Sequence, residues 1–259
     1  MILRNFFQAN FYLIVIFLIS CNFTDKKKFY DLDFLEEKEA WRDVQKLCEN
    51  QDIEYKERNF ELLKKYKNEI SLNPESSLYY FLLGRLSGLL GEPQKSKFFF
   101  EIALKKDPEF VWGHYGLGLY YLKTGENFKA KAYFSKCLLY IPDFAPAFIG
   151  IAKLEENNPN LALANLKEAH KYMPENPEIL LYIAQILIAL DNKNEAESYY
   201  LKAFQIAPEN LNILKKVAFF FMQKKEYSRA RDFFLKILNL TKSEKERKNI
   251  EKIINNLLN

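Results

Sequence analysis

The spacing of its prolines constrains this chain of 259 residues more than any other feature. Five of them divide the sequence at intervals of 34, 34, 32 and 34 residues: Pro74, Pro108, Pro142, Pro174 and Pro208. A period in this range is typical of stacked helical hairpins, in which each hairpin covers the apolar faces of its neighbours. The spacing therefore predicts an all-α chain, an α-solenoid of antiparallel helical hairpins.

Small residues return at matching places in successive intervals. A Leu-Gly pair stands early in the first two, at Leu83-Gly84 and Leu117-Gly118, and alanine replaces the glycine later. A second small residue recurs in the second half of the later intervals, at Ala130, Ala162, Ala196 and Ala230. Small side chains let two helices approach closely, and the apolar residues around them follow helical spacing. Each interval is thus predicted to hold two helices, with the proline ending the second.

This pattern resembles the tetratricopeptide repeat family over about residues 75–242. The match is strongest in the interval that ends at Pro142, which carries Leu117, Gly118, Tyr121, Gly125, Ala130 and Phe134 in phase, with Cys137 at the second small position. The resemblance implies about five repeats, at residues 77–110, 111–144, 145–176, 177–210 and 211–242. The third is two residues short, and we expect the loss in the turn at residues 157–160.

The regions on either side of the repeats are predicted to close the array. Residues 33–74 read as a degenerate leading hairpin that lacks the Leu-Gly pair. Ser243 and Glu246 form a capping-box pattern, which predicts a helix over residues 243–259 with one apolar stripe. This helix suits a C-terminal cap of the solenoid, and a docking helix for another protein is the alternative.

The amino-terminal segment indicates a compartment. Arg4 precedes an unbroken apolar run at residues 11–19, which is shorter than a membrane span and suits a signal peptide. The run leads into Ser20-Cys21, which resembles the lipobox of bacterial lipoproteins. The resemblance implies a signal peptide at residues 1–20, lipidation of Cys21 and a lipid-anchored protein of the bacterial cell envelope. An uncleaved anchor and an ordinary signal peptide are the alternatives.

Residues 21–32 then form a polar tether that includes Lys26, Lys27 and Lys28. These lysines are expected to be solvated, with contact to anionic headgroups as the alternative. The formal net charge of +4 over the whole chain does not predict a nucleic-acid partner, which requires a clustered basic face.

The sequence contains no pattern that predicts catalysis, a cofactor or a metal site. His114 and His170 have no Cys, His or acidic partner at metal-ligand spacing. The glycines near residue 116 lack the Lys-Ser/Thr that directly follows the last glycine of a phosphate-binding loop. Cys137 occupies a small packing position, and Cys48 lies too far along a stack to pair with it. We therefore predict that the protein is not an enzyme.

The resemblance further implies that the first helix of each repeat lines a concave face. The side chains expected there, as candidate partner-binding residues, are Phe81, Arg85, Trp112, Tyr115, Leu119, Leu122, Ile149, Lys153, Leu181, Gln185, Ile188, Lys215, Phe219 and Met222. The set is largely apolar, and Phe81 and Tyr115 stand where chaperone-binding members of the family place the lysine of a carboxylate clamp. The expected ligand is a helix or extended segment with apolar anchors. The alternative is that these side chains pack within the chain itself.

The predicted function is a membrane-anchored adaptor or scaffold that binds proteins in the cell envelope. The resemblance leaves the membrane, inner or outer, open. A surface-exposed lipoprotein that binds an external ligand is the alternative, and an enzyme regulator or enzyme is a further one.

Overall fold

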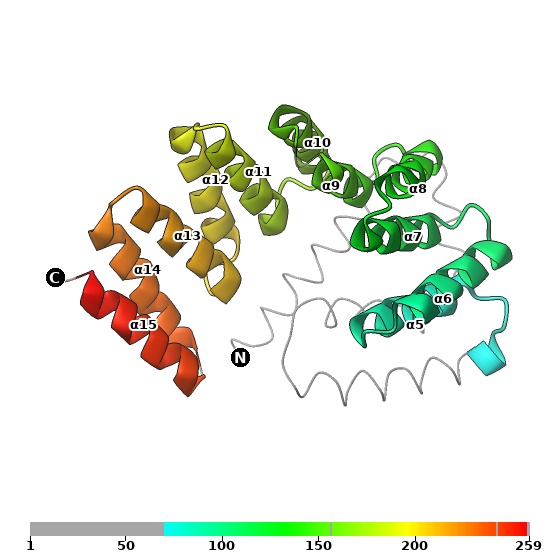
Figure 1. Ribbon diagram of the computed structural model, residues 1–259, viewed down its shortest axis with the longest axis horizontal. Helices are drawn as coiled ribbons and strands as arrows, with labels where there is room; N and C mark the ends of the chain where they lie inside the picture. Colours follow the sequence, from blue (N-terminus) through cyan, green and yellow to red (C-terminus); the bar gives the residue numbers. More distant parts are fainter. Residues whose placement is uncertain (1–69, 156, 242, 258–259) are drawn as a thin grey trace, which may run out of the picture. The chain divides into compact units, whose positions relative to one another are not determined.

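The computed structural model describes residues 70–155, 157–241 and 243–257, and these residues form helices joined by short turns, with no strand among them (Figure 1). The predicted all-α solenoid is confirmed. The chain divides into two compact units, unit 1 over Met1–Gly150 and unit 2 over Ile151–Asn259. The predicted signal peptide, the tether and residues 33–69 of the leading hairpin lie outside the described residues.

Unit 1 is built from helical hairpins. Its helices are α5 (Ser77–Leu89), α6 (Pro93–Lys106), α7 (Val111–Thr124), α8 (Asn127–Tyr140) and the first part of α9 (Ala145–Leu154). Helix α5 pairs with α6 and α7 pairs with α8, while α6 also packs against α7. Each hairpin therefore covers part of the next.

Unit 2 repeats this arrangement and ends in an additional helix. It contains α10 (Pro159–Tyr172), α11 (Pro177–Ala189), α12 (Lys193–Ile206), α13 (Leu211–Gln223), α14 (Tyr227–Leu240) and α15 (Glu244–Asn256). Helix α11 pairs with α12 and α13 pairs with α14. Helix α15 packs against α14.

The prolines mark the ends of the second helices. Helices α6, α8, α10 and α12 each end two residues before the proline of their repeat. The short third repeat departs from the expected turn, because Pro159 and Asn160 belong to the first turn of α10. The side chain of Asn158 caps this helix by accepting a hydrogen bond from the Leu161 N–H at 3.3 Å. The two missing residues are therefore taken from the end of α9, which spans only 10 residues.

Two phenylalanines of unit 1 each lie between two glycines. A Cβ atom placed on Gly84 or on Gly116 would approach the Phe100 ring to 2.5 or 2.7 Å. Phe134 is held in the same way by Gly118 of its own hairpin and Gly150 of α9, with a closest approach of 2.5 Å to each. Such distances lie well inside van der Waals contact. Each ring thus occupies the space of two absent side chains and joins one hairpin to the first helix of the next.

The turns inside the hairpins share one backbone feature. Gly125 ends α7 with a left-handed φ of 78°, and Lys225 adopts a φ of 60° at the equivalent place between α13 and α14. After each of these residues, an N–H returns to the first helix: Glu126 donates to the Tyr121 carbonyl and Glu226 donates to the Phe221 carbonyl, both at 2.9 Å. The left-handed residue reverses the chain, and glycine adopts it with the least strain.

Ion pairs connect the hairpins of unit 2. Glu197 of α12 contacts both Lys224 and Arg229, and these two cations also reach Glu226 at 2.6 and 2.7 Å. The Arg229 guanidinium lies over the Phe221 ring at 3.8 Å, which adds a cation–π contact. The network joins α12 to the turn before α14.

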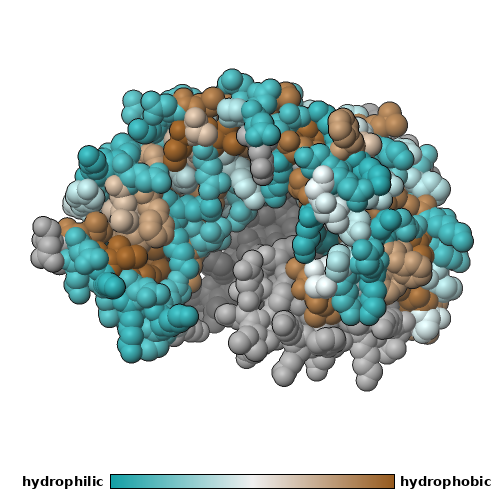
Figure 2. Space-filling view, viewed as in Figure 1, coloured by the Kyte–Doolittle hydropathy of each residue, from teal (hydrophilic) through white to brown (hydrophobic). Residues whose placement is uncertain are grey.

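The surface is mostly hydrophilic on the face seen in Figure 2, and hydrophobic residues reach it at separate places. Large apolar side chains that remain exposed include Phe98, Phe128, Leu139, Phe219 and Leu235. At these positions, among others, the packing of the hairpins leaves apolar surface in water.

Candidate protein-binding surface

The candidate residues of α7 belong to an aromatic cluster in unit 1. Trp112 packs against Phe81 and Tyr115, both with ring centroids 5.8 Å away, and against Phe144 at 5.0 Å. Tyr115 also contacts Phe134 at 5.9 Å. Trp112 and Tyr115 are half-buried, whereas Phe81 is buried. The structure therefore brings these three predicted residues together, with much of their area used in packing between repeats.

The remaining candidates of unit 1 are partly exposed. Arg85 of α5, Leu119 and Leu122 of α7 and Ile149 of α9 are all half-buried. Leu119 and Leu122 follow Tyr115 at spacings of four and three residues, which places them along one face of α7. This face continues the aromatic cluster toward the end of the helix.

Two candidates of unit 2 are engaged in packing or in a ring contact. Leu181 of α11 is buried. The ammonium of Lys153, near the end of α9, lies 5.0 Å from the centre of the Tyr182 ring. These contacts lie within unit 2 and tie α9 to α11.

The other five candidates lie on α11 and α13, two first helices that approach each other in unit 2. Gln185, Ile188, Lys215 and Met222 are half-buried, and Phe219 is 47% exposed. We call these five residues the α11/α13 surface. The Phe219 ring forms a T-shaped contact with the Phe234 ring, with centroids 5.5 Å apart. An exposed phenylalanine beside a methionine is the strongest candidate anchor for an apolar partner on this surface.

The C-terminal helix closes one side of this surface. Lys215 forms an ion pair with Glu246 of α15. Glu246 also accepts a hydrogen bond from the Thr241 hydroxyl at 2.7 Å, and its N–H donates to the Ser243 side chain at 3.4 Å. Hydrogen bonds from Lys215 and Thr241 lower the pKa of the Glu246 carboxyl, against the opposing effect of burial. Ser243 caps the helix as predicted, whereas the Glu246 carboxylate bonds Thr241 and the candidate binding residue Lys215.

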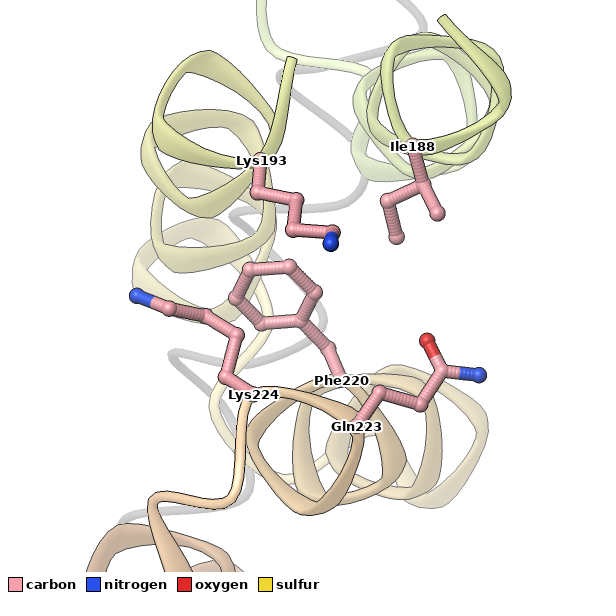
Figure 3. Close-up of a pocket in the computed structure, with 5 residues that line it drawn as sticks. All are labelled: Ile188, Lys193, Phe220, Gln223 and Lys224. Atoms are coloured by element: carbon pink, nitrogen blue, oxygen red, sulfur yellow. The ribbon is translucent and has the colours of Figure 1, made fainter. Parts of the chain in front are cut away.

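A small gap beside the α11/α13 surface is too narrow for a ligand. Ile188, Lys193, Phe220, Gln223 and Lys224 line it, and its volume is about 10 Å³, the room that one water molecule needs. Figure 3 shows the Lys193 side chain reaching toward Ile188 across the Phe220 ring, with Lys224 directed away. The ammonium of Lys224 lies 5.7 Å from the centre of the same ring. Any partner of this surface therefore binds on it rather than in this gap.

The histidines and the described cysteine serve packing. His114 is buried, stacks on Tyr140 at 5.4 Å and has its Nε2 2.8 Å from the Pro108 carbonyl oxygen. Burial lowers the pKa of His114, and burial together with Lys202 lowers the pKa of His170.

Cys137 is fully buried, and its thiol donates to the Tyr133 carbonyl at 3.3 Å. Burial raises the pKa of this thiol to about 12. The predicted packing role of Cys137 is confirmed.

The described residues offer neither a metal site nor a membrane-spanning helix. No cluster of three or more His, Cys, Asp or Glu side chains in this part of the chain is arranged to hold a metal ion. In the same residues, every helix falls short of the length and apolar character that crossing a bilayer requires. Cys21 lies outside the described residues.

One apolar feature was missed by the sequence reasoning. Phe128 and Leu139 of α8 are 93% and 76% exposed, although they belong to a second helix. A comparison of the repeats position by position could have found them, because the other repeats carry polar residues at both positions.

Comparison with known proteins agrees with this architecture. Two models of the tetratricopeptide repeat match the chain, one over residues 113–144 and one over residues 153–202. No curated protein matches the sequence.

Several solved structures share the fold at low sequence identity. A thermophilic TPR protein of Thermus thermophilus superposes with a TM-score of 0.58 at 17% identity, covering 71% of this chain and 99% of its own. PilF of Pseudomonas aeruginosa superposes with a TM-score of 0.60 at 17% identity, covering 71% of this chain and 87% of its own. A tetratricopeptide repeat protein of Parabacteroides merdae superposes with a TM-score of 0.60 at 20% identity, covering 78% of each chain. This chain therefore contains tetratricopeptide repeats within an all-α solenoid.

Proposed function

We propose that this protein is a lipid-anchored adaptor or scaffold of the bacterial cell envelope, not an enzyme, and that it binds protein partners through its first helices. The tetratricopeptide fold supports protein–protein interaction as the general role. The observation that carries the proposal for this chain is Phe219, a large aromatic side chain that is 47% exposed on the α11/α13 surface.

The chemistry of the α11/α13 surface suits a segment with apolar anchors and polar flanks. Phe219 and Met222 offer a flat aromatic ring and an adaptable thioether, and Gln185 offers an amide that both donates and accepts. A partner helix places apolar side chains at spacings of three and four residues, which match the spacing of the anchors along α13. The aromatic cluster of unit 1 contributes less to binding in this proposal, because its rings already pack on one another.

The proposed lipid anchor rests on Cys21 and the apolar run before it. Two acyl chains on this residue would hold the protein stably at a bilayer, so that the repeats recruit partners near the membrane. Incorporation of labelled palmitate into the full chain, lost on Cys21→Ala, is the expected result. Labelling that persists in Cys21→Ala would refute the assignment.

Site-specific photocrosslinking in intact cells tests the binding surface. A photoreactive phenylalanine analogue at position 219 is expected to capture a discrete partner, and the same analogue at position 235 is the matched control. Leu235 is a comparably exposed apolar residue, at 38%, on the second helix α14. The proposal predicts a crosslink from position 219 that disappears when Met222 is replaced by Glu.

A stability measurement makes this experiment decisive. Met222→Glu is expected to leave the thermal midpoint of the chain unchanged, since Met222 is only half-buried. Equal crosslinking from positions 219 and 235, or a crosslink unaffected by Met222→Glu in a folded protein, would rule out the α11/α13 surface as the binding site.

A further inference from the structure

The outer face of α8 carries an apolar stripe that its position in the fold does not explain. Phe128, Ala132, Ser135 and Leu139 follow one another at spacings of four, three and four residues, so they share one face of the helix. All four are exposed, and the two large side chains are 93% and 76% exposed. We call these four residues the α8 stripe. Its two large apolar residues lie about 16 Å apart along the helix axis.

The other repeats of the same chain provide an internal reference for this face. At the position of Phe128 they carry Gln94, Asn160, Asn194 and Ser228. At the position of Leu139 they carry Lys105, Lys171, Gln205 and Asn239. The fold therefore requires no apolar side chain at either position, and α8 departs from the polar pattern at both ends of one face. An exposed apolar stripe of this kind marks an interaction surface.

The charges beside the stripe indicate what this contact is. Lys129, Lys131 and Lys136 are exposed on its two sides, and α8 contains no acidic residue. Lys129 forms an ion pair with Glu126 just before the helix at 2.6 Å, and the ammonium of Lys136 lies 5.3 Å from the centre of the Tyr133 ring. A second copy of α8 would bring lysines against lysines, so the charges disfavour self-association. They are complementary to an anionic surface.

We propose that the outer face of α8 lies on an anionic lipid surface, with Phe128 and Leu139 inserted at headgroup level and the flanking lysines against the lipid phosphates. A helix with a line of bulky apolar residues and lysines on its margins is the pattern of an element that lies in the membrane interface. Lysine suits this place because its long stem reaches from the apolar region to the headgroups. This contact does not depend on the acyl anchor proposed at Cys21, although such an anchor would hold α8 close to the bilayer.

A local fluorescence probe tests the contact in the full chain. With Cys21 and Cys48 replaced by serine, an environment-sensitive label is placed at Ser135→Cys in the middle of the stripe. The reference label is at Ser198→Cys, on the exposed face of α12. Each protein is mixed with vesicles of phosphatidylcholine alone or of phosphatidylcholine with phosphatidylglycerol, including lipids that carry a bromine quencher. Because both labelled proteins carry the apolar amino-terminal run, the difference between positions 135 and 198 separates contact through α8 from binding through that run.

The proposal predicts a blue shift and quenching at position 135 with the anionic vesicles only, reversed by high salt, and no change at position 198. Replacing the two large residues by those of other repeats, Phe128→Asn with Leu139→Gln, is expected to weaken the response roughly tenfold. Leu235→Gln on α14 is the matched control and is expected to leave it intact.

Three outcomes would overturn the proposal. One is an unchanged spectrum at position 135 with both kinds of vesicle. Another is a response to neutral vesicles that equals the response to anionic vesicles and is insensitive to salt. The third is a spectral shift that grows with protein concentration in the absence of lipid, which would assign the stripe to a second copy. Failure of palmitate labelling would leave these results unaffected, so the anchor and the α8 contact are tested separately.

Discussion

Gly118→Ala measures how tightly the α7–α8 hairpin is packed. Alanine is favoured over glycine inside a helix by about 1 kcal/mol, so the change would stabilise α7 if space were available. Space is not available, because the new Cβ atom would lie 2.5 Å from Cε1 and 2.7 Å from Cδ1 of Phe134. The ring cannot retreat, since Phe134 is fully buried and meets Gly150 as closely on the next helix.

The expected magnitude follows from these two opposing terms. Inserting a carbon into a well-packed core costs about 1–3 kcal/mol, and the short contact places this site toward the upper end. After subtraction of the gain in helix propensity, Gly118→Ala is expected to lower the free energy of unfolding by about 1–2 kcal/mol. For a chain of this length the loss corresponds to a fall of roughly 2–8 °C in the thermal midpoint.

A double-mutant cycle with Phe134→Leu isolates the contact. Leucine at position 134 removes the ring atoms that the new Cβ would meet, so Gly118→Ala should become neutral or stabilising in that background. The third repeat already carries the compensated pair, Ala152 and Leu166, at the two equivalent positions. The expected coupling energy is about 1–2 kcal/mol in favour of the double variant.

Thermal unfolding of the four proteins gives the midpoints, and amide hydrogen exchange in α7 and α8 reports the local effect. The local measurement is needed because repeat arrays unfold in segments as well as globally. Effects that add within about 0.5 kcal/mol would refute the account of Phe134 as a ring wedged between two glycines.

Three further changes test other contacts. Lys225→Gly is expected to raise the thermal midpoint, because glycine relieves the left-handed φ that Gly125 adopts without strain in the equivalent turn; a fall would show that the Lys225 side chain matters more than its backbone. In a chain with Cys21 and Cys48 replaced by serine, Cys137 is expected to resist maleimide at neutral pH and to react in urea. The reason is that its thiol is buried and has a pKa of about 12; rapid labelling of the folded chain would contradict this burial. The pKa of Glu246 is lowered in the folded chain, so its contribution to stability is present above its ordinary value and is lost as the pH falls through the folded pKa. Protection of the α15 amides from hydrogen exchange, measured relative to the intrinsic exchange rate at each pH, should therefore fall in mild acid, and Glu246→Gln should remove that dependence; an unchanged acid response in Glu246→Gln would show that another group is responsible.

Much of the fold was predictable because proline and small residues act locally. A proline two residues beyond a helix fixes where the helix stops, and this held for α6, α8, α10 and α12. The third repeat was harder to predict, because proline is also favoured in the first turn of a helix. Pro159 takes that role after the Asn158 cap, so the shortening fell on α9 instead of on the turn.

The exposure of the candidate binding residues was less predictable. A position within the repeat gives the direction in which a side chain points, but its exposure depends on the size of its neighbours. Phe81 is buried because Phe100, Phe110 and Trp112 surround its ring. Phe219 stays exposed at a later position of its own first helix, where Phe234 is the only described residue in ring contact with it. Such differences arise from pairs of residues distant in sequence, and a single-chain pattern does not reveal them.

The glycines that hold Phe100 and Phe134 also restrict which hairpins could follow these two rings. At each of these two junctions the earlier hairpin supplies the ring, and the first helix after it supplies a glycine, Gly116 or Gly150. The first repeat has Leu82 at that place, and the third supplies Leu166 instead of a ring. Of these three, the α7–α8 hairpin alone both receives a phenylalanine ring, at Gly116, and supplies one, Phe134, so it has this kind of junction on both of its sides.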